Sequence, residues 1–232
     1  MENRSSNKSA RESILQSIRS NLAASAPHDL KESGIHHAFD APLKALASFG
    51  QDGSLVDLFK ASLEAVDGKC LIVQNESELV QKLTEIIVRL RGTQLRARRI
   101  ALSDAPELEG LVNQLEIEFD EVALTPSASE VFNFDVGISR AQAGIAETGT
   151  LLLDSSRERH RLVSLVPPVH IAIVDANQIV ATLGEALVLM RKENQVSSIV
   201  TLVTGPSRTA DIELTLAIGV HGPQELYVII RR

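Results

Sequence analysis

The chain of 232 residues has one cysteine, no tryptophan and only 3% aromatic residues. One thiol cannot supply the ligands of a four-cysteine iron–sulfur cluster or of a cysteine-rich zinc site, and it cannot form an internal disulfide. The thiol belongs to Cys70, in the apolar run KCLIVQ. Because buried apolar cysteines are usually inert, this position favours a core thiol over a nucleophile.

Long hydrophobic runs are also missing. No segment approaches the roughly 18 uninterrupted apolar residues of a membrane span, and the first twenty residues lack the apolar core of a secretory signal. We therefore expect a cytoplasmic protein without a membrane span. The net charge of −7 argues against nucleic acid as the main partner.

Two further classes of site have no sequence support. The six histidines show no HxxxH or HExxH spacing, and the chain contains no GxxxxGK[ST] loop. The sequence therefore predicts no metal site and no hydrolysis of nucleoside triphosphates. No cofactor is predicted in this chain.

What the sequence does contain is an alternation of helices and strands. Residues 1–27 are predicted to form an N-terminal amphipathic helix with Ile14, Leu15 and Ile18 on one stripe, and residues 28–53 a linker. Residues 54–232 then predict a single α/β domain. Its strand-helix-strand-helix order indicates a mainly parallel sheet covered on both faces, a three-layer sandwich. Buried strands are expected at residues 70–73, 99–102, 170–175, 199–203 and 226–230.

The first candidate site is a carboxylate between threonines and glycines in the run AGIAETGT. Glu147 is followed by Thr148, Gly149 and Thr150. Glycines allow close backbone approach, and the N–H groups of such a turn can hold an anion. Glu147 is a candidate base, nucleophile or acceptor for a ligand hydroxyl. The alternative is a strand-turn-strand in which Glu147 caps backbone groups, and the sequence leaves both open.

The second candidate site is the run TGPSRTAD, which follows a predicted buried strand. The carboxyl ends of strands bind ligands in open parallel sheets. Gly205 shapes the turn, Ser207 and Thr209 offer hydroxyls, and Arg208 offers a planar fork for a carboxylate or phosphate. Asp211 is placed to hold Arg208. A solvated turn with an Arg–Asp pair is the structural alternative.

His221, in the run GVHGP, completes the candidates. The flanking residues predict a tight turn, and histidine is the side chain most easily tuned for proton transfer near neutral pH. A lone histidine is more often structural. The five arginines between residues 89 and 99 surround a predicted helix end, and a solvated face is the favoured interpretation there.

Taken together, four ordered blocks resemble the lactate utilization protein C family, whose members consist of a lactate-utilization (LUD) domain. The blocks are AGIAETGTLLLDS, RLVSLVPPVHIAIV, TGPSRTADIE and GVHGPQELYVII. The resemblance implies the three-layer α/β fold of the glucosamine-6-phosphate deaminase, ribose-5-phosphate isomerase and CoA-transferase superfamily. It also implies a role in the oxidation of L-lactate to pyruvate, with iron–sulfur clusters held only by partner proteins.

The leading hypothesis is thus an accessory subunit of a lactate-oxidising system that binds a small carboxylate or phosphate, with Glu147 and His221 handling protons or substrate hydroxyls. An independent isomerase or acyl/CoA transferase using Glu147 is the first alternative. The Glu147-Thr148-Gly149 run looks similar to the glutamate turn of CoA-transferases but lacks the usual asparagine. A non-catalytic scaffold that assembles through residues 1–27 is the second. The sequence leaves a homo-oligomer open.

Overall fold

The computed structural model describes residues 12–20, 54–155, 161–191, 199–210, 216–218 and 221–232. The chain divides into two units, Met1–Pro42 and Leu43–Arg232. In the first unit residues 12–20 are helical. The predicted linker at residues 28–53 lies outside the described residues.

The larger unit is built on a six-stranded sheet in the order β1-β12-β7-β4-β2-β3. Every neighbouring pair of strands in this sheet is parallel. The strands are β1 (Lys69–Val73), β2 (Arg99–Leu102), β3 (Glu121–Leu124), β4 (Val136–Arg140), β7 (Val169–Asp175) and β12 (Glu225–Arg231). A mainly parallel sheet was the prediction from the alternation of helices and strands, and it is confirmed.

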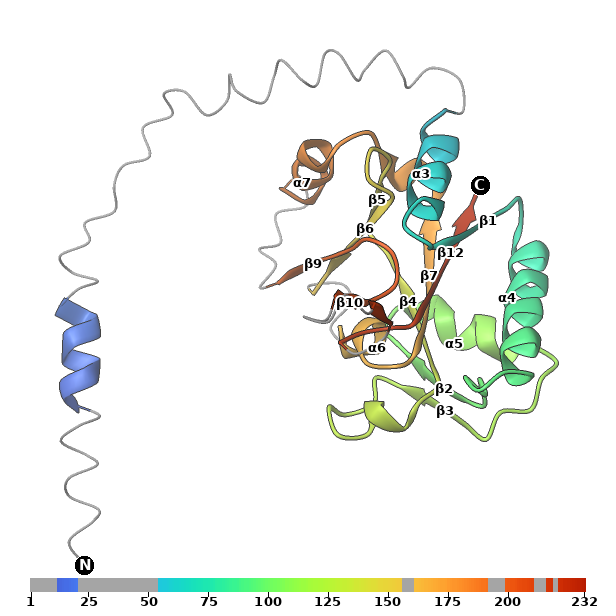
Figure 1. Ribbon diagram of the computed structural model, residues 1–232, viewed down its shortest axis with the longest axis horizontal. Helices are drawn as coiled ribbons and strands as arrows, with labels where there is room; N and C mark the ends of the chain where they lie inside the picture. The colour runs from blue at the N-terminus through green and yellow to red at the C-terminus, as the bar shows by residue number, and fades with distance from the viewer. Residues whose placement is uncertain (1–11, 21–53, 156–160, 192–198, 211–215, 219–220) are drawn as a thin grey trace, which may run out of the picture. The chain divides into compact units, whose positions relative to one another are not determined.

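Helices α4 (Glu76–Arg91) and α5 (Pro106–Asn113) cover one face of this sheet (Figure 1). Asn75 starts α4, because its side chain accepts from the N–H of Glu78 at 2.9 Å and the Glu78 carboxylate accepts from the N–H of Gln74 at 2.7 Å. The apolar stripe of α4 is buried against the strands: Leu79, Leu83, Ile86, Ile87 and Leu90.

The other face is covered by α3 (Ser54–Glu64), by the short helix α6 (Leu162–Leu165) and by a second sheet. The strands of the second sheet run in the order β8-β5-β6-β9 and comprise Ile179–Val180, Ala143–Ile145, Thr150–Asp154 and Val200–Val203. Helix α7 (Leu183–Arg191) packs on this sheet. Figure 1 shows the second sheet and α4 on opposite sides of the central strands, so the domain has three layers.

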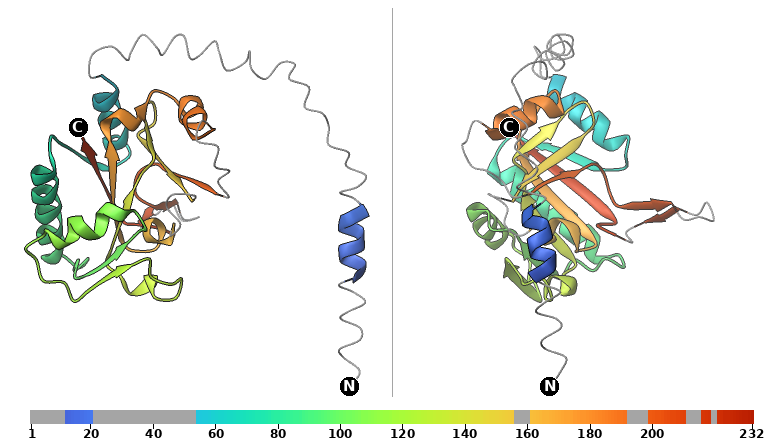
Figure 2. Two further views of the ribbon diagram at one scale, coloured as in Figure 1. Left: turned by 180° about the vertical axis from the view of Figure 1, so that it is seen from behind. Right: turned by 90° about the vertical axis from the view of Figure 1, so that its left-hand side faces the viewer.

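Shorter elements complete the unit. Two 3-10 helices, η2 (Val131–Asn133) and η3 (Ala176–Gln178), follow β3 and β7. Strands β10 (Arg208–Ala210) and β11 (Leu216–Ile218) pair antiparallel and project from the body as a hairpin (Figure 2, right). Arg208 therefore stands at the base of this hairpin.

One predicted strand forms, but it lies in a different sheet from the one expected. The run at residues 199–203 was expected to be buried in the parallel sheet, but β9 is an edge strand of the second sheet and pairs antiparallel with β6. Val200 and Leu202 are 37% and 47% exposed. Because one face of an edge strand meets solvent, an apolar run alone does not identify a central strand. The segment after β9 therefore does not lie at the carboxyl edge of the parallel sheet.

Candidate functional site

Two of the predicted segments, those that contain Gly149 and Gly205, pack against the end of α3 and the turn that follows it. Gly149 has φ of +63°, and a Cβ there would lie 2.2 Å from the backbone nitrogen of Leu63. Gly205 has φ of +75°, and a Cβ there would lie 2.7 Å from the carbonyl oxygen of Val66. Both glycines were predicted to bind a ligand, and both are required by close packing against this helix end.

A chain of threonine hydroxyls joins these two segments. Oγ1 of Thr150 lies 2.7 Å from Oγ1 of Thr148 and 2.7 Å from Oγ1 of Thr204. Thr150 is buried, whereas Thr148 and Thr204 are exposed. Three hydroxyls contribute three protons, and two of these are used within the chain. When Thr150 donates to one neighbour and accepts from the other, the remaining proton is offered by one of the two exposed ends.

The third predicted segment adjoins the second. The N–H of Ser207 donates to the carbonyl of Pro223 at 2.8 Å, and a Cβ on Gly222 would lie 3.1 Å from Cβ of Ser207. His221, next to Gly222, is exposed. The three segments that the sequence singled out are thus neighbours, although a long stretch of chain separates the first from the other two.

Arg208 forms an ion pair with Asp67, in the turn after α3. Asp67 has φ of +63°, so a non-glycine residue holds the left-handed position of this turn. The two side chains are 37% and 70% exposed. Asp211, which was expected to hold Arg208, lies outside the described residues, as does the side chain of Thr209.

Glu147 follows β5 in the chain, and its side chain reaches the start of α7. Its Oε1 accepts from the N–H of Leu183 at 3.2 Å, while Oγ1 of Thr182 accepts from the N–H of Glu185 at 3.3 Å. The Glu185 carboxylate in turn accepts from the N–H of Ala181 at 2.9 Å. These bonds satisfy N–H groups that a helix start leaves without intrahelical partners. The geometry favours the capping interpretation of Glu147 over a chemical one.

Cys70 is buried between the sheet and α3, where desolvation raises the pKa of its thiol to about 12. This environment supports a core thiol. Among the residues that the structure describes, no three His, Cys, Asp or Glu side chains gather as they would around a metal ion. None of the described helices has the length and apolar character to cross a bilayer.

The sequence missed a buried serine–histidine pair on the face of the sheet that α6 covers. Oγ of Ser139 in β4 lies 2.7 Å from Nε2 of His170 in β7. Burial lowers the pKa of His170 to about 3. Its Nδ1 has no hydrogen-bond partner within the described part of the chain. The register of β4 on β7 sets this pair, and no local sequence signal reveals a register.

The sequence also missed an ion network at the carboxyl edge of the central sheet. Arg140 pairs with both Glu107 and Asp175, and Nε of Arg231 donates to Asp175 at 2.7 Å. Ligands often bind at this edge of parallel sheets. Here Arg140 and Arg231 share Asp175, and Arg140 also reaches Glu107, so the network ties β4, β7, β12 and α5 together.

Comparison with known proteins finds a matching family model and relatives that align over most of the chain. A family model described as LUD domain matches residues 56–230. The protein NMB1437 of Neisseria meningitidis serogroup B is 34% identical over 95% of this chain and 93% of its own length. Lactate utilization protein C of Anoxybacillus flavithermus is 26% identical over 94% of this chain and 98% of its own length.

A solved structure shows the same fold. The crystal structure of a DUF162 family protein from Deinococcus radiodurans aligns with a TM-score of 0.55 at 22% identity, covering 78% of this chain and 99% of that chain. The LUD-domain match extends over nearly the whole larger unit, from α3 to β12. The chain therefore belongs to the LUD-domain family.

Proposed function

We propose that this chain is a component of an L-lactate utilization system, in which lactate is oxidised to pyruvate. The observation that carries the proposal is the similarity, over nearly full length, to relatives named lactate utilization protein C. Besides the Anoxybacillus flavithermus protein, the one from Oceanobacillus iheyensis is 27% identical over 91% of this chain and 95% of its own length. Oxidation of lactate to pyruvate releases two electrons and two protons, so the system needs an electron acceptor.

In this proposal the electrons pass to iron–sulfur clusters in partner proteins. The cysteine content supports this division of labour, because cluster ligands are thiolates and this chain has one cysteine. That thiol is buried and its pKa is raised to about 12. The chain would then act in the cytoplasm as an accessory subunit of the oxidising system.

The joined segments around the end of α3 are the proposed site for a small anionic ligand. Arg208 and Ser207 would hold a carboxylate or phosphate, with the free proton of the threonine chain as a further donor. An exposed ion pair such as that of Arg208 with Asp67 contributes only about 0–1 kcal/mol. A ligand carboxylate can therefore replace Asp67 on Arg208 at small cost.

Thermal melting with L-lactate tests the site. A ligand that binds only the folded state raises the melting temperature, and the rise grows with the ratio of ligand concentration to dissociation constant. We expect a rise for the wild-type chain that Arg208→Gln abolishes. Arg98→Gln is the matched control, because Arg98 is exposed and its ion pair with Asp120 at 3.7 Å lies elsewhere. An equal rise in Arg208→Gln, or no rise in the wild type, rejects L-lactate as the ligand of this site.

Growth tests the role in the pathway separately from the ligand site. A strain that lacks the gene for this chain should fail to grow on L-lactate as sole carbon source and should grow normally on pyruvate. Expression of the wild-type chain should restore growth on lactate. Normal growth of the deletion strain on lactate would reject the pathway assignment.

A further inference from the structure

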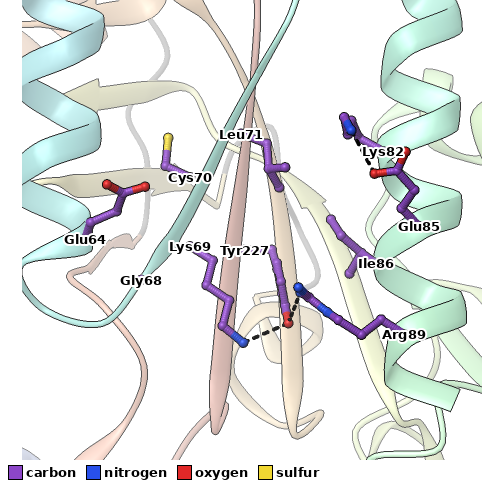
Figure 3. Close-up of a pocket in the computed structure, with 10 residues that line it drawn as sticks. All are labelled: Glu64, Gly68, Lys69, Cys70, Leu71, Lys82, Glu85, Ile86, Arg89 and Tyr227. Atoms are coloured by element: carbon purple, nitrogen blue, oxygen red, sulfur yellow. Dashed lines mark hydrogen bonds and ion pairs between the residues drawn. The ribbon is translucent and has the colours of Figure 1, made fainter. Parts of the chain in front are cut away.

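A second polar cluster lies beyond the turn that carries Asp67, at the start of β1. Strand register places Lys69 beside Tyr227 of β12, and the last turn of α4 brings Arg89 to the same point. Nζ of Lys69 donates to the Tyr227 hydroxyl at 2.8 Å, and Nη2 of Arg89 donates to it at 2.6 Å (Figure 3). The hydroxyl itself donates to Glu225.

Lys69, Arg89 and Tyr227 line a cavity of about 440 Å³ between α3, β1 and α4. Pockets for small molecules commonly measure about 300–1,000 Å³. Leu71 and Ile86 provide apolar wall, and Figure 3 shows them beside the Lys69–Tyr227–Arg89 cluster. Glu64, Lys82 and Glu85 also line the cavity, and Lys82 pairs with Glu85 at 2.7 Å. The cavity therefore combines the Lys69–Arg89 pair at one end with an apolar wall, which suits an amphipathic ligand.

The hydrogen-bond inventory leaves donors for such a ligand. Lys69 uses one proton on Tyr227 and one on Glu225 at 2.7 Å, which leaves a third. Arg89 uses one of its five N–H groups on Tyr227, and within the described residues no carboxylate lies at ion-pair distance from it. Since Lys69 and Arg89 bond to one oxygen atom, a single anion can contact both.

Tyr227 fixes the two cations in place. Its hydroxyl accepts two hydrogen bonds and donates one, so it has no capacity left for a ligand. Nζ of Lys69 and the guanidinium carbon of Arg89 also lie 4.6 Å and 5.2 Å from the centre of its ring. Tyr227 is therefore a positioning residue.

We propose that this cavity binds a small organic anion. Its carboxylate or phosphate is held by Arg89 and Lys69, and its apolar body lies on Leu71 and Ile86. A bidentate arginine contact supplies the orientation, and the lysine supplies a second charge. This site is distinct from the one proposed at Arg208 and does not depend on it.

Tyrosine fluorescence tests the proposal directly, because Tyr227 is the only tyrosine and the chain has no tryptophan. The full chain is titrated with hexanoate, hexyl phosphate and inorganic phosphate. We expect a saturable change with hexanoate or hexyl phosphate at a concentration at least tenfold lower than for inorganic phosphate. The comparison of the first two probes identifies the preferred head group. No saturable change with any probe overturns the proposal.

Variants and a neutral probe separate charge recognition from apolar binding. Arg89→Gln and Lys69→Gln should each weaken binding of the preferred anion about tenfold or more, while Arg98→Gln should leave it unchanged. Hexan-1-ol tests the cavity without a charge and needs no variant, so the result stands even if a variant fails to fold. Binding of hexan-1-ol as tight as that of hexanoate and hexyl phosphate, or undiminished binding in folded Arg89→Gln, overturns the proposal.

Discussion

The hydroxyl of Ser139 lies 2.7 Å from Nε2 of His170, and both side chains are buried in the middle of the domain. The pair lies under α6, which approaches so closely that a Cβ on Gly137 would lie 1.8 Å from the carbonyl oxygen of Val163. Burial makes it costly to charge the imidazole here. His170 is therefore neutral in the folded protein, with its pKa lowered to about 3 by burial.

This burial predicts an acid-sensitive fold. Unfolded histidine has a pKa near 6.5, so the unfolded chain takes up a proton below this pH while folded His170 does not. Above about pH 6.5 the imidazole is neutral in both states and does not lower the free energy of unfolding. As pH falls from 6.5 toward 3, the free energy of unfolding decreases by about 1.4 kcal/mol per pH unit. Urea unfolding at pH 7, 6, 5 and 4 should show this slope. His170→Asn should flatten it, whereas His221→Gln, at an exposed position, should not.

The close packing of Gly149 predicts a severe effect of a single methyl group. Gly149→Ala would place a Cβ 2.2 Å from the nitrogen of Leu63 at a φ of +63°. We expect a loss of at least about 3 kcal/mol in the free energy of unfolding, from strain and displacement of α3. Gly110→Ala is the matched control, because nothing lies within 4 Å of its added Cβ in α5. That variant should gain about 0.5–1 kcal/mol, and equal effects at the two sites would contradict the packing argument.

The two interpretations of Glu147 give opposite results in one experiment. A glutamine keeps an oxygen that can accept from the N–H of Leu183 but removes the carboxylate chemistry. From the capping geometry we expect Glu147→Gln to restore growth of the deletion strain on L-lactate. We expect Glu147→Ala to lower the free energy of unfolding by about 0.5–1 kcal/mol. A folded Glu147→Gln chain that cannot restore growth would favour a chemical role instead.

The lone thiol offers a measure of local opening. Because burial raises the pKa of Cys70 to about 12, its thiolate is scarce at pH 8. We expect labelling by iodoacetamide at pH 8 to be at least a hundredfold slower in the folded chain than in urea. The single cysteine makes mass spectrometry of the whole chain sufficient for the measurement. Rapid labelling without denaturant would contradict a core position.

Periodic segments could be predicted from the sequence because their signal is local. The buried residues of α4 repeat at helical spacing, and the strand that contains Cys70 is a short apolar run in the core. The position of β9 could not be predicted in the same way, since its apolar run is equally compatible with an edge strand. Its neighbours show that it belongs to the second sheet.

The site was harder to predict, because its contacts join distant residues. The sequence singled out Thr150 and Arg208, but their partners Thr204 and Asp67 are set by the packing around the end of α3. The cationic cluster at Tyr227 depends on strand register and on the last turn of α4. Arginines near that helix end were expected to form a solvated face, and only the fold reveals the cavity beside Arg89.

The strand order has a consequence for how the protein is made. Strand β12 lies between β1 and β7, so residues 225–231 separate the earliest strand of the central sheet from the others. Until residues 225–231 have left the ribosome, β1 has no neighbour in this sheet. The apolar side chains of β1 therefore reach their place in the sheet only when the segment of β12 is available. The central sheet is therefore complete only after the segment of β12 has been added between β1 and β7.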